Sequence, residues 1–180
     1  MILLRYSILK NTHPDFDYPW VGGTPIKSVS AMPEELVICL KQVNDISFDL
    51  LNYSNFLIVS KRLYDYMSAR GFAYENDKSR VRLVDPKGNM LTKEVFYFLR
   101  CYWWDIKNNE VQLIRDESTN ALMAACTDST KDFLMTNEKD YCYELFVSAG
   151  LKAEIEAKFK NPMLFTLEEW NELNSDDWDF

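Results

Sequence analysis

The chain has 180 residues, of which 47% are hydrophobic and 14% aromatic, so it can bury a sizeable core and is not disordered in composition. It has five glycines and neither a GxGxxG nor a GxxxxGK[ST] motif, which argues against a Gly-rich phosphate loop. The net charge is −8, and after Lys160 the chain has six acidic residues and no Lys or Arg; this disfavours direct nucleic-acid binding and favours a basic partner.

The amino terminus and the hydropathy of the chain bear on its location. The first ten residues are apolar, but Arg5 interrupts them and polar residues follow at once, unlike the order of regions in a signal peptide. No uncharged apolar run approaches the roughly 20 residues that span a bilayer. We therefore expect a cytoplasmic protein that does not enter a membrane, unless it is exported without a signal.

The cysteines are widely spaced and form no CxxC pair: Cys39, Cys101, Cys126 and Cys142. Their neighbours are apolar, which favours reduced, buried thiols that act as small hydrophobic side chains. Disulfides and zinc ligands are the alternatives. No cofactor is expected from this pattern.

The chain begins with an expected strand over residues 2–9, and a polar connection follows over residues 10–35. Prolines and glycines punctuate this connection, namely Pro14, Pro19, Gly22, Gly23, Pro25 and Pro33. They exclude a long helix here. Trp20 lies in this connection after Tyr18 and Pro19, and such loop aromatics either fold back over the core or face a partner.

The clearest pattern in the chain is an apolar strand that leads into a capped helix. The apolar run Phe56–Val59 predicts a buried strand, and Ser60 is the expected N-cap of the following helix. Leu63 and Met67 recur at helical spacing on one face. Gly71 is expected to end this helix in a left-handed conformation.

Strands joined by short turns are expected on both sides of this helix. Residues 36–43 and 79–84 indicate strands, and residues 85–89 carry proline and glycine where a type I turn prefers them. The run 94–104 has two mostly apolar faces, which is typical of a central strand covered on both sides. With residues 111–115 it predicts a meander of antiparallel strands.

A weaker copy of the strand–serine–helix pattern occurs later in the chain. Four residues recur at an offset of 88 positions: Leu57, Val59, Ser60 and Leu63 match Leu145, Val147, Ser148 and Leu151. Ser148 is again the expected N-cap, and Asn161-Pro162 is expected to stop the helix. The repetition predicts two copies of one unit, around residues 55–84 and 143–167.

The remaining segments complete the expected fold. Residues 116–131 fit a short helix or a loop, whereas residues 133–135 and 163–165 indicate strands. Residues 166–169, Thr-Leu-Glu-Glu, form a capping box that opens a short helix to about Leu173.

Together the elements predict an α+β fold: a mainly antiparallel sheet with the two strand–serine–helix units packed on it. We expect a single domain over residues 1–173, with the two units as lobes of a pseudo-repeat. Residues 174–180 are expected to form an acidic tail.

Nucleophilic catalysis has little support. Ser60 and Ser148 lie between strand and helix, but a nucleophile elbow needs glycines two residues to either side, and one of the four positions is glycine. His13 is the only histidine, so at most one catalytic dyad could form. Both serines are therefore interpreted as helix caps.

Metal and carboxylate chemistry are also weakly indicated. The acidic run 176–179 lacks the spacing and glycine of an EF-hand loop, so a solvated tail is favoured over a cation site. Glu75, Asp105 and Glu110 lie near aromatic residues that could line a sugar cleft, but their spacing does not select them. The sequence thus gives little support for a metal site, and a hydrolase that uses these carboxylates stays the least favoured alternative function.

Binding of a partner protein is expected at the aromatic and acidic segments. Residues 102–105, Tyr-Trp-Trp-Asp, are the densest aromatic stretch, and strand alternation turns one of the two tryptophans toward a less covered side. Core packing is the alternative for this stretch. The residues assigned to partner binding are Trp20, Trp103, Trp104, Asp105, Asp176, Asp177, Trp178 and Asp179.

Several of these segments recur in a known order. They are Tyr18-Pro19-Trp20 ahead of Pro25, Phe56–Ser60 opening a helix, Tyr97-Phe98 in the central strand, Tyr143–Ser148 with its helix, and Leu167–Trp170. Over about residues 18–170 the chain resembles the immunity proteins of bacterial polymorphic toxin systems, in particular the immunity protein 43 family. The related immunity protein 11 group is the alternative. The glycine usual after the second helix is replaced near Asn161-Pro162.

The resemblance implies a cytosolic protein that binds and neutralises a cognate toxin, with no enzymatic activity. Neutralisation would be stoichiometric, by occluding the active site of the toxin or by holding the toxin in an inactive form. The acidic charge of the chain suits a basic toxin, such as a nuclease. A cytosolic adaptor for another basic protein is the alternative function.

Overall fold

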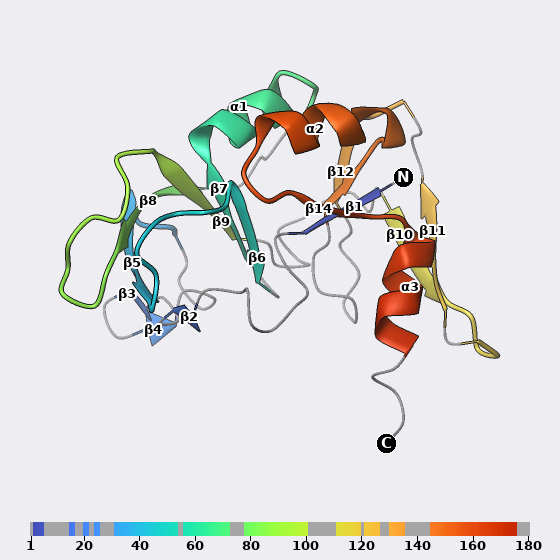
Figure 1. Cartoon of the computed structure of the whole chain (residues 1–180), viewed down its shortest axis with the longest axis horizontal. Helices are drawn as coiled ribbons and strands as arrows, with labels where there is room; N and C mark the ends of the chain where they lie inside the picture. The colour runs from blue at the N-terminus through green and yellow to red at the C-terminus, as the bar shows by residue number, and fades with distance from the viewer. Residues whose placement is uncertain are drawn as a thin grey trace.

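A computed structural model of the chain describes residues 2–5, 15–16, 20–21, 24–25, 31–53, 56–72, 78–100, 111–119, 121–126, 130–135 and 145–175. Figure 1 shows a larger sheet at one end of the molecule and a helix beside a hairpin at the other. Two further helices lie side by side along one edge of the view, between these ends.

The larger sheet has six strands in the order β2-β5-β8-β9-β7-β6. They are β2 (Asp15–Phe16), β5 (Glu35–Lys41), β6 (Leu50–Tyr53), β7 (Phe56–Ser60), β8 (Lys78–Val84) and β9 (Phe96–Arg100). β5 and β8 are parallel, and the other neighbouring pairs are antiparallel. β9 lies between β7 and β8 and is mostly buried, as its two apolar faces predict.

A second sheet has four strands in the order β12-β13-β1-β14, all antiparallel. They are β1 (Ile2–Arg5), β12 (Phe133–Met135), β13 (Leu145–Val147) and β14 (Met163–Phe165). Two short pairs stand apart: β3 (Trp20–Val21) with β4 (Thr24–Pro25), and β10 (Val111–Arg115) with β11 (Leu122–Cys126). The described sheets are thus mainly antiparallel.

The helices follow β7, β13 and β14. They are α1 (Lys61–Ser68), the 3₁₀ helix η2 (Ala149–Leu151) that leads into α2 (Lys152–Lys158), and α3 (Leu167–Ser175). The predicted capping box of α3 is confirmed, because Thr166 N donates to Glu169 Oε2 (2.8 Å) and Glu169 N donates to Thr166 Oγ1 (3.1 Å). α3 continues past Leu173 and takes in the first two residues of the expected tail.

Two apolar clusters form the core on the two faces of the larger sheet. Successive strand residues point to opposite faces, so Phe56 and Ile58 of β7 join one cluster and Leu57 and Val59 join the other. The second cluster also contains Leu63 and Met67 of α1, Leu145 and Val147 of β13, and Ile155 of α2. The two strand–serine–helix units therefore share one core, and the predicted α+β class is confirmed.

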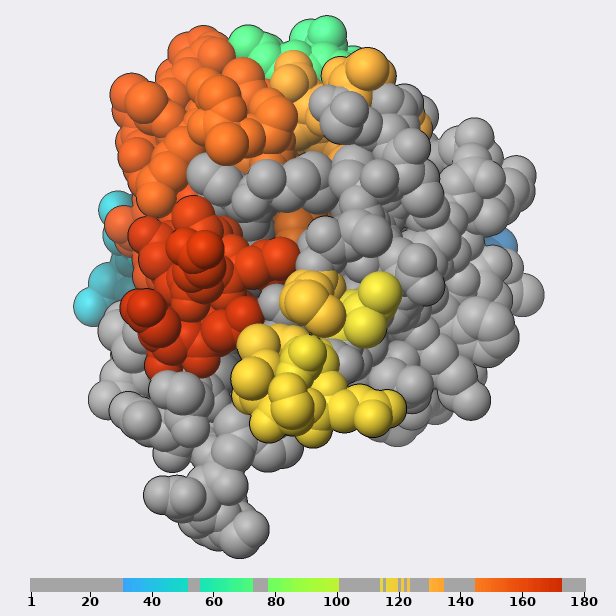
Figure 2. All heavy atoms as spheres, turned by 90° about the vertical axis from the view of Figure 1, so that its right-hand side faces the viewer, coloured from blue at the N-terminus to red at the C-terminus, as the bar shows by residue number. Residues whose placement is uncertain are grey.

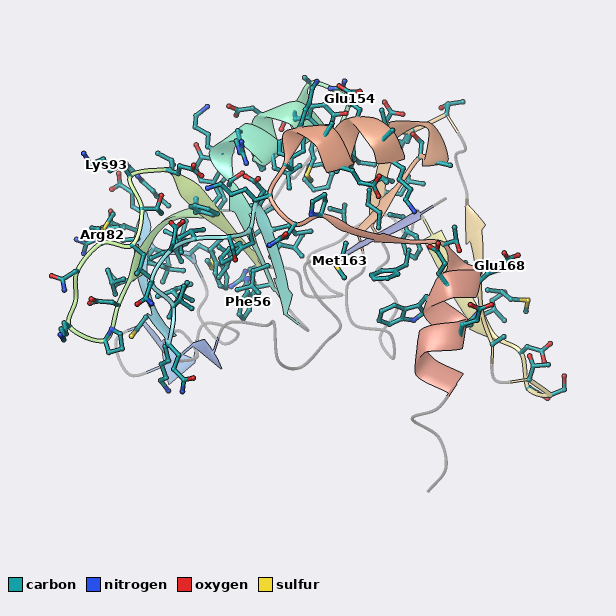
Figure 3. All side chains as sticks on the ribbon, in the orientation of Figure 1. Phe56, Arg82, Lys93, Glu154, Met163 and Glu168 are labelled. Carbon is teal, nitrogen blue, oxygen red and sulfur yellow. The ribbon has the colours of Figure 1, made fainter. Side chains whose placement is uncertain are left out.

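Contacts between α1 and α2 join the two units directly. Arg70 Nη2 donates to both carboxylate oxygens of Glu154 (3.1 and 3.3 Å), and its guanidinium lies 3.7 Å from the centre of the Tyr66 ring. Tyr66 packs edge-on against Phe159 of the second unit, with ring centres 5.1 Å apart. Figure 3 shows Glu154 on α2, where that helix runs beside α1.

The repeat is longer in the structure than in the sequence pattern. In the first unit, Ser60 N donates to the backbone oxygen of Asp49 (2.8 Å), and Ser60 Oγ donates to the Asp49 carboxylate. In the second unit, Ser148 N donates to the backbone oxygen of Asp132 (2.9 Å), and Ser148 Oγ donates to Asp132 Oδ1 (2.9 Å). Each aspartate directly precedes the strand that pairs with the strand before the serine. Both segments therefore have the same order of features: aspartate, strand, strand, serine, helix.

The two serines differ in whether the side chain caps the helix that follows. Leu63 N donates to Ser60 Oγ (3.2 Å), so the predicted cap of α1 is confirmed, and Gly71 takes the expected left-handed φ of 84°. Ser148 stands at the N-cap position, but its side chain makes no capping hydrogen bond. The predicted side-chain cap at Ser148 is therefore wrong. The helix begins with the 3₁₀ turn η2, and the Ser148 hydroxyl donates its hydrogen bond to Asp132.

This difference gives an expected result for matched substitutions. Ser60→Ala should lower the free energy of unfolding by about 2 kcal/mol, because it removes both a cap and a donor to a buried carboxylate. Ser148→Ala should cost about 1 kcal/mol, because it removes one hydrogen bond. Urea denaturation measures both values. Equal losses for the two variants would show that the capping hydrogen bond of Ser60 adds nothing to stability.

The expectation of a short helix or loop over residues 116–131 is wrong for residues 122–126, which form β11. Alanines in this run favour a helix by intrinsic propensity, but β10 pairs with the run along its length. The turn is set by Asp116, whose carboxylate accepts from Ser118 N (2.9 Å) and Thr119 N (2.8 Å). Hydrogen bonds from Ser118 and Thr119 lower the pKa of Asp116 to about 2.

Candidate partner-binding surface

Of the residues assigned to partner binding from sequence, one lies in a described element. Trp20 begins β3, where its backbone pairs with Pro25. The others lie outside the described residues: Trp103, Trp104, Asp105, Asp176, Asp177, Trp178 and Asp179. The structure brings no two of the eight together within its described part, so their role in binding stays a prediction.

The strand–helix turn at Ser60 is occupied by a buried carboxylate. Asp49 is 1% exposed, and its side chain accepts from Ser60 Oγ, Arg62 Nε (2.7 Å), Arg62 Nη2 and Lys160 N (2.6 Å). Burial raises the pKa of Asp49, but the hydrogen bonds from Arg62, Lys160 and Ser60 outweigh it and hold the pKa below 3.8. Asp49 is therefore an ionised structural centre.

This network also settles what Ser60 does. The Ser60 hydroxyl donates its proton to Asp49 and accepts from Leu63 N, so both of its hydrogen-bonding functions serve the fold. The predicted role as a cap holds, and the nucleophile alternative has no support at this turn. His13 lies outside the described residues, as do Glu75, Asp105 and Glu110 of the hydrolase alternative.

The segment after α2 closes onto the same network. Lys160 Nζ donates to Ile46 O (3.3 Å) and lies 3.2 Å from Glu94 Oε1. Asn161 has a left-handed φ of 47°, and its amide donates to Ser47 O (2.8 Å). Asparagine tolerates this conformation better than other residues with a side chain. Asn161 thus takes the conformation that a glycine would supply at the end of the second helix.

The exposed large hydrophobic residues of the described part are few: Val37, Met90, Ile114 and Met123. Ile114 of β10 and Met123 of β11 are directly opposite each other in the antiparallel register. They are 44% and 47% exposed. Opposite residues on one face of a strand pair have Cβ atoms about 5 Å apart. Ile114 and Met123 therefore form one apolar patch on the β10–β11 hairpin.

Acidic side chains lie next to this hairpin. α3 packs against β11, and Figure 2 shows the described atoms of the hairpin and of α3 together on one face. The exposed carboxylates Glu168, Glu169 and Glu172 belong to α3, which contains no Lys or Arg. Glu117 is exposed in the hairpin turn beside Asp116. We call the patch Ile114/Met123 with these carboxylates the hairpin–α3 surface.

The opposite end of the molecule carries a different surface. Val37 of β5 is 51% exposed, and its neighbour in the register on β8 is Arg82. Arg82 Nε lies 2.9 Å from Glu35 Oε1, and Arg80 is also exposed. Figure 3 shows Arg82 and Glu168 toward opposite ends of the long axis. The β5–β8 face is thus of mixed charge, whereas the hairpin–α3 surface is acidic.

Sequence reasoning missed two features, the buried carboxylate of Asp49 and the apolar patch Ile114/Met123. Asp49 has a recognisable signal, since it is a lone charge inside the apolar stretch Phe48-Asp49-Leu50-Leu51. The patch Ile114/Met123 depends on the register of β10 with β11, which residues 116–131 did not reveal.

Cys39 is a half-buried free thiol. Among the described residues, no group of three His, Cys, Asp or Glu is placed to hold a metal ion.

These features describe an α+β protein in which an apolar patch lies beside a helix with exposed carboxylates. The family model for immunity protein 43 matches residues 3–180, and the chain belongs to that family. The predicted resemblance is thereby confirmed. A comparison with curated proteins gave no match.

Family membership implies an immunity protein, with a toxin as partner in general and a role that is not enzymatic. As for the membrane, none of the helices in the described part of the chain has the length and apolar character needed to cross a bilayer.

Proposed function

We propose that this protein binds a cognate bacterial toxin domain in the cytoplasm and neutralises it stoichiometrically, by occluding its active site. Membership of the immunity protein 43 family over residues 3–180 carries this proposal. The buried serine network is consistent with it, since Ser60 serves the fold and is not an available nucleophile. In this proposal the protein acts as a binding partner and not as an enzyme.

The proposed toxin is basic. The chain has a net charge of −8, and the excess is concentrated after Lys160, where no Lys or Arg follows. Opposite charges on two partners accelerate their encounter and suppress binding of wrong partners. A basic toxin domain, such as one that acts on nucleic acid, would be steered toward the acidic carboxyl-terminal part of this chain.

Co-expression tests the proposal. We expect a neighbouring gene to encode a larger secreted protein with a variable carboxyl-terminal domain, and that domain to kill cells unless this protein is present. Protection should require about one molecule per toxin, measured by titrating purified protein against toxin activity. Equal killing with and without this protein would overturn the pairing. Capture of a housekeeping partner and no toxin from the native host would favour the adaptor alternative.

The acidic end gives a kinetic prediction. Because α3 extends to Ser175, the cut that leaves α3 intact removes residues 176–180, which carry three aspartates. This truncation should slow association with a basic toxin several-fold at low salt and reduce the salt dependence of the association rate. Stopped-flow mixing measures the rate. An unchanged association rate at low salt would exclude steering by this segment.

A further inference from the structure

We propose that the hairpin–α3 surface is where the toxin domain docks, with the patch Ile114/Met123 at the centre of the interface and the carboxylates around it. This inference rests on the proposed function and adds the surface and the chemistry of the partner. The partner face should be basic with an apolar centre. The exposure of the patch, the charge of its rim and the partners that this charge repels favour this occupant.

The first observation is the exposure of a paired apolar patch. Among the described residues, β10 and β11 pair only with each other, and a two-stranded hairpin is marginally stable unless it packs on something. The hairpin packs against α3 through β11, yet Ile114 and Met123 stay 44% and 47% exposed. The fold does not use this face fully. Ile114 and Met123 thus form one small exposed apolar patch, and methionine adapts readily to a partner surface.

The second observation is the charge of the rim. Three exposed glutamates lie on α3, the helix that packs against β11, and Asp116 and Glu117 lie in the turn of the hairpin itself. The pKa of Asp116 is about 2, so this carboxylate stays ionised at neutral pH. An apolar centre inside a polar rim is the usual anatomy of a protein interface. The charged side chains that the structure describes in this rim are all acidic.

The third observation is what this rim excludes. A second copy of the chain docked face to face would place carboxylates against carboxylates, which is destabilising. An anionic lipid surface or a nucleic acid would be repelled for the same reason. The β5–β8 face differs, because Val37 lies beside Arg80 and Arg82 and is thus surrounded by mixed charge. A basic protein is therefore the occupant that the hairpin–α3 surface fits.

The test uses the full-length chain and the carboxyl-terminal domain of the secreted protein encoded beside it. The variant Ile114→Ser/Met123→Ser should weaken binding of that domain about 100-fold, mainly through faster dissociation. The variant Glu168→Gln/Glu172→Gln should slow association several-fold at low salt. Matched controls are Val37→Ser, an equally exposed apolar residue on the β5–β8 face, and Glu156→Gln on α2, an exposed glutamate outside the surface. Both controls should bind like wild type.

The outcomes separate the two proposals. If wild type binds and the Ile114/Met123 variant binds as tightly, the docking surface is wrong while the proposed function stands. If wild type does not bind the domain, both are overturned. All variants change exposed residues, and circular dichroism with thermal unfolding checks that each is folded. A fully folded Ile114/Met123 variant that loses protection in co-expressing cells supports the surface.

Discussion

Asp49→Ala is expected to lower the free energy of unfolding by about 3 kcal/mol, a large effect for a polar residue. The substitution removes the acceptor that Ser60 Oγ, Arg62 and Lys160 N share, and it leaves a hydroxyl and a backbone N–H without a partner in a buried place. Arg62 is 45% exposed and can turn to water, so its loss is partly compensated. The first helix and the segment after α2 are loosened together.

The measurement is urea denaturation, with Asp65→Ala as the matched control. Asp65 also pairs with a cation, Lys61, but both side chains are more than half exposed. Exposed pairs of this kind contribute about 0.5 kcal/mol. A loss for Asp49→Ala no larger than that for Asp65→Ala would show that the buried network does not stabilise the fold.

The same residue gives a pH dependence whose sign follows from its pKa. Burial raises the pKa of Asp49, but hydrogen bonds from Arg62, Lys160 and Ser60 lower it by more. The pKa of Asp49 in the folded state is therefore below the ordinary value of 3.8. The folded state therefore releases the proton more readily than the unfolded chain. The resulting stabilisation is complete above pH 3.8 and is lost as the pH falls through the folded pKa.

Comparison with Asp49→Asn isolates this contribution. The difference in free energy of unfolding between wild type and Asp49→Asn should be constant from about pH 7 to about pH 5 and should shrink below about pH 4. Urea titrations at each pH measure it. A difference that grows as the pH falls would mean that the folded state raises the pKa of Asp49.

Local sequence patterns predicted the elements that are marked by apolar alternation or by a capping residue. Alternation and apolar runs gave the central strand and β7, and the side chains of Ser60 and Thr166 marked the starts of α1 and α3. The match of Ser60 with Ser148 predicted two similar units, and in the structure each of the two serine hydroxyls donates to an aspartate, Asp49 or Asp132. Each of these signals lies within a few residues of the element it predicts.

Long-range pairing is what the sequence did not reveal. Asp49 and Lys160 are 111 residues apart in the sequence. No local pattern predicts that the backbone N–H of Lys160, after the second helix, donates to the carboxylate of Asp49. β11 was missed because its alanines fit a helix locally, while its strand conformation depends on pairing with β10. The apolar patch of the hairpin follows from that register, so it could not be found without the structure.

The shared core makes a second large effect testable. Ile155 of α2 is fully buried in the cluster that includes Leu57, Leu63 and Met67 of the first unit. Ile155→Ala should lower the free energy of unfolding by about 3 kcal/mol, since it removes buried methyl groups and leaves a cavity. Val37→Ala, at an exposed β-branched residue, should cost less than about 0.5 kcal/mol.

Whether Ile155→Ala destabilises both units or the second unit alone tests the prediction that residues 1–173 form one domain. Because the units share a core and the Asp49 network, we expect Ile155→Ala to lower the protection of amides in β7 and α1 by as much as that of amides in β13. Native-state hydrogen exchange measures both, and unfolding followed by circular dichroism and by fluorescence should coincide. Unchanged protection in β7 and α1, with loss confined to the second unit, would show that the two units unfold as separate domains.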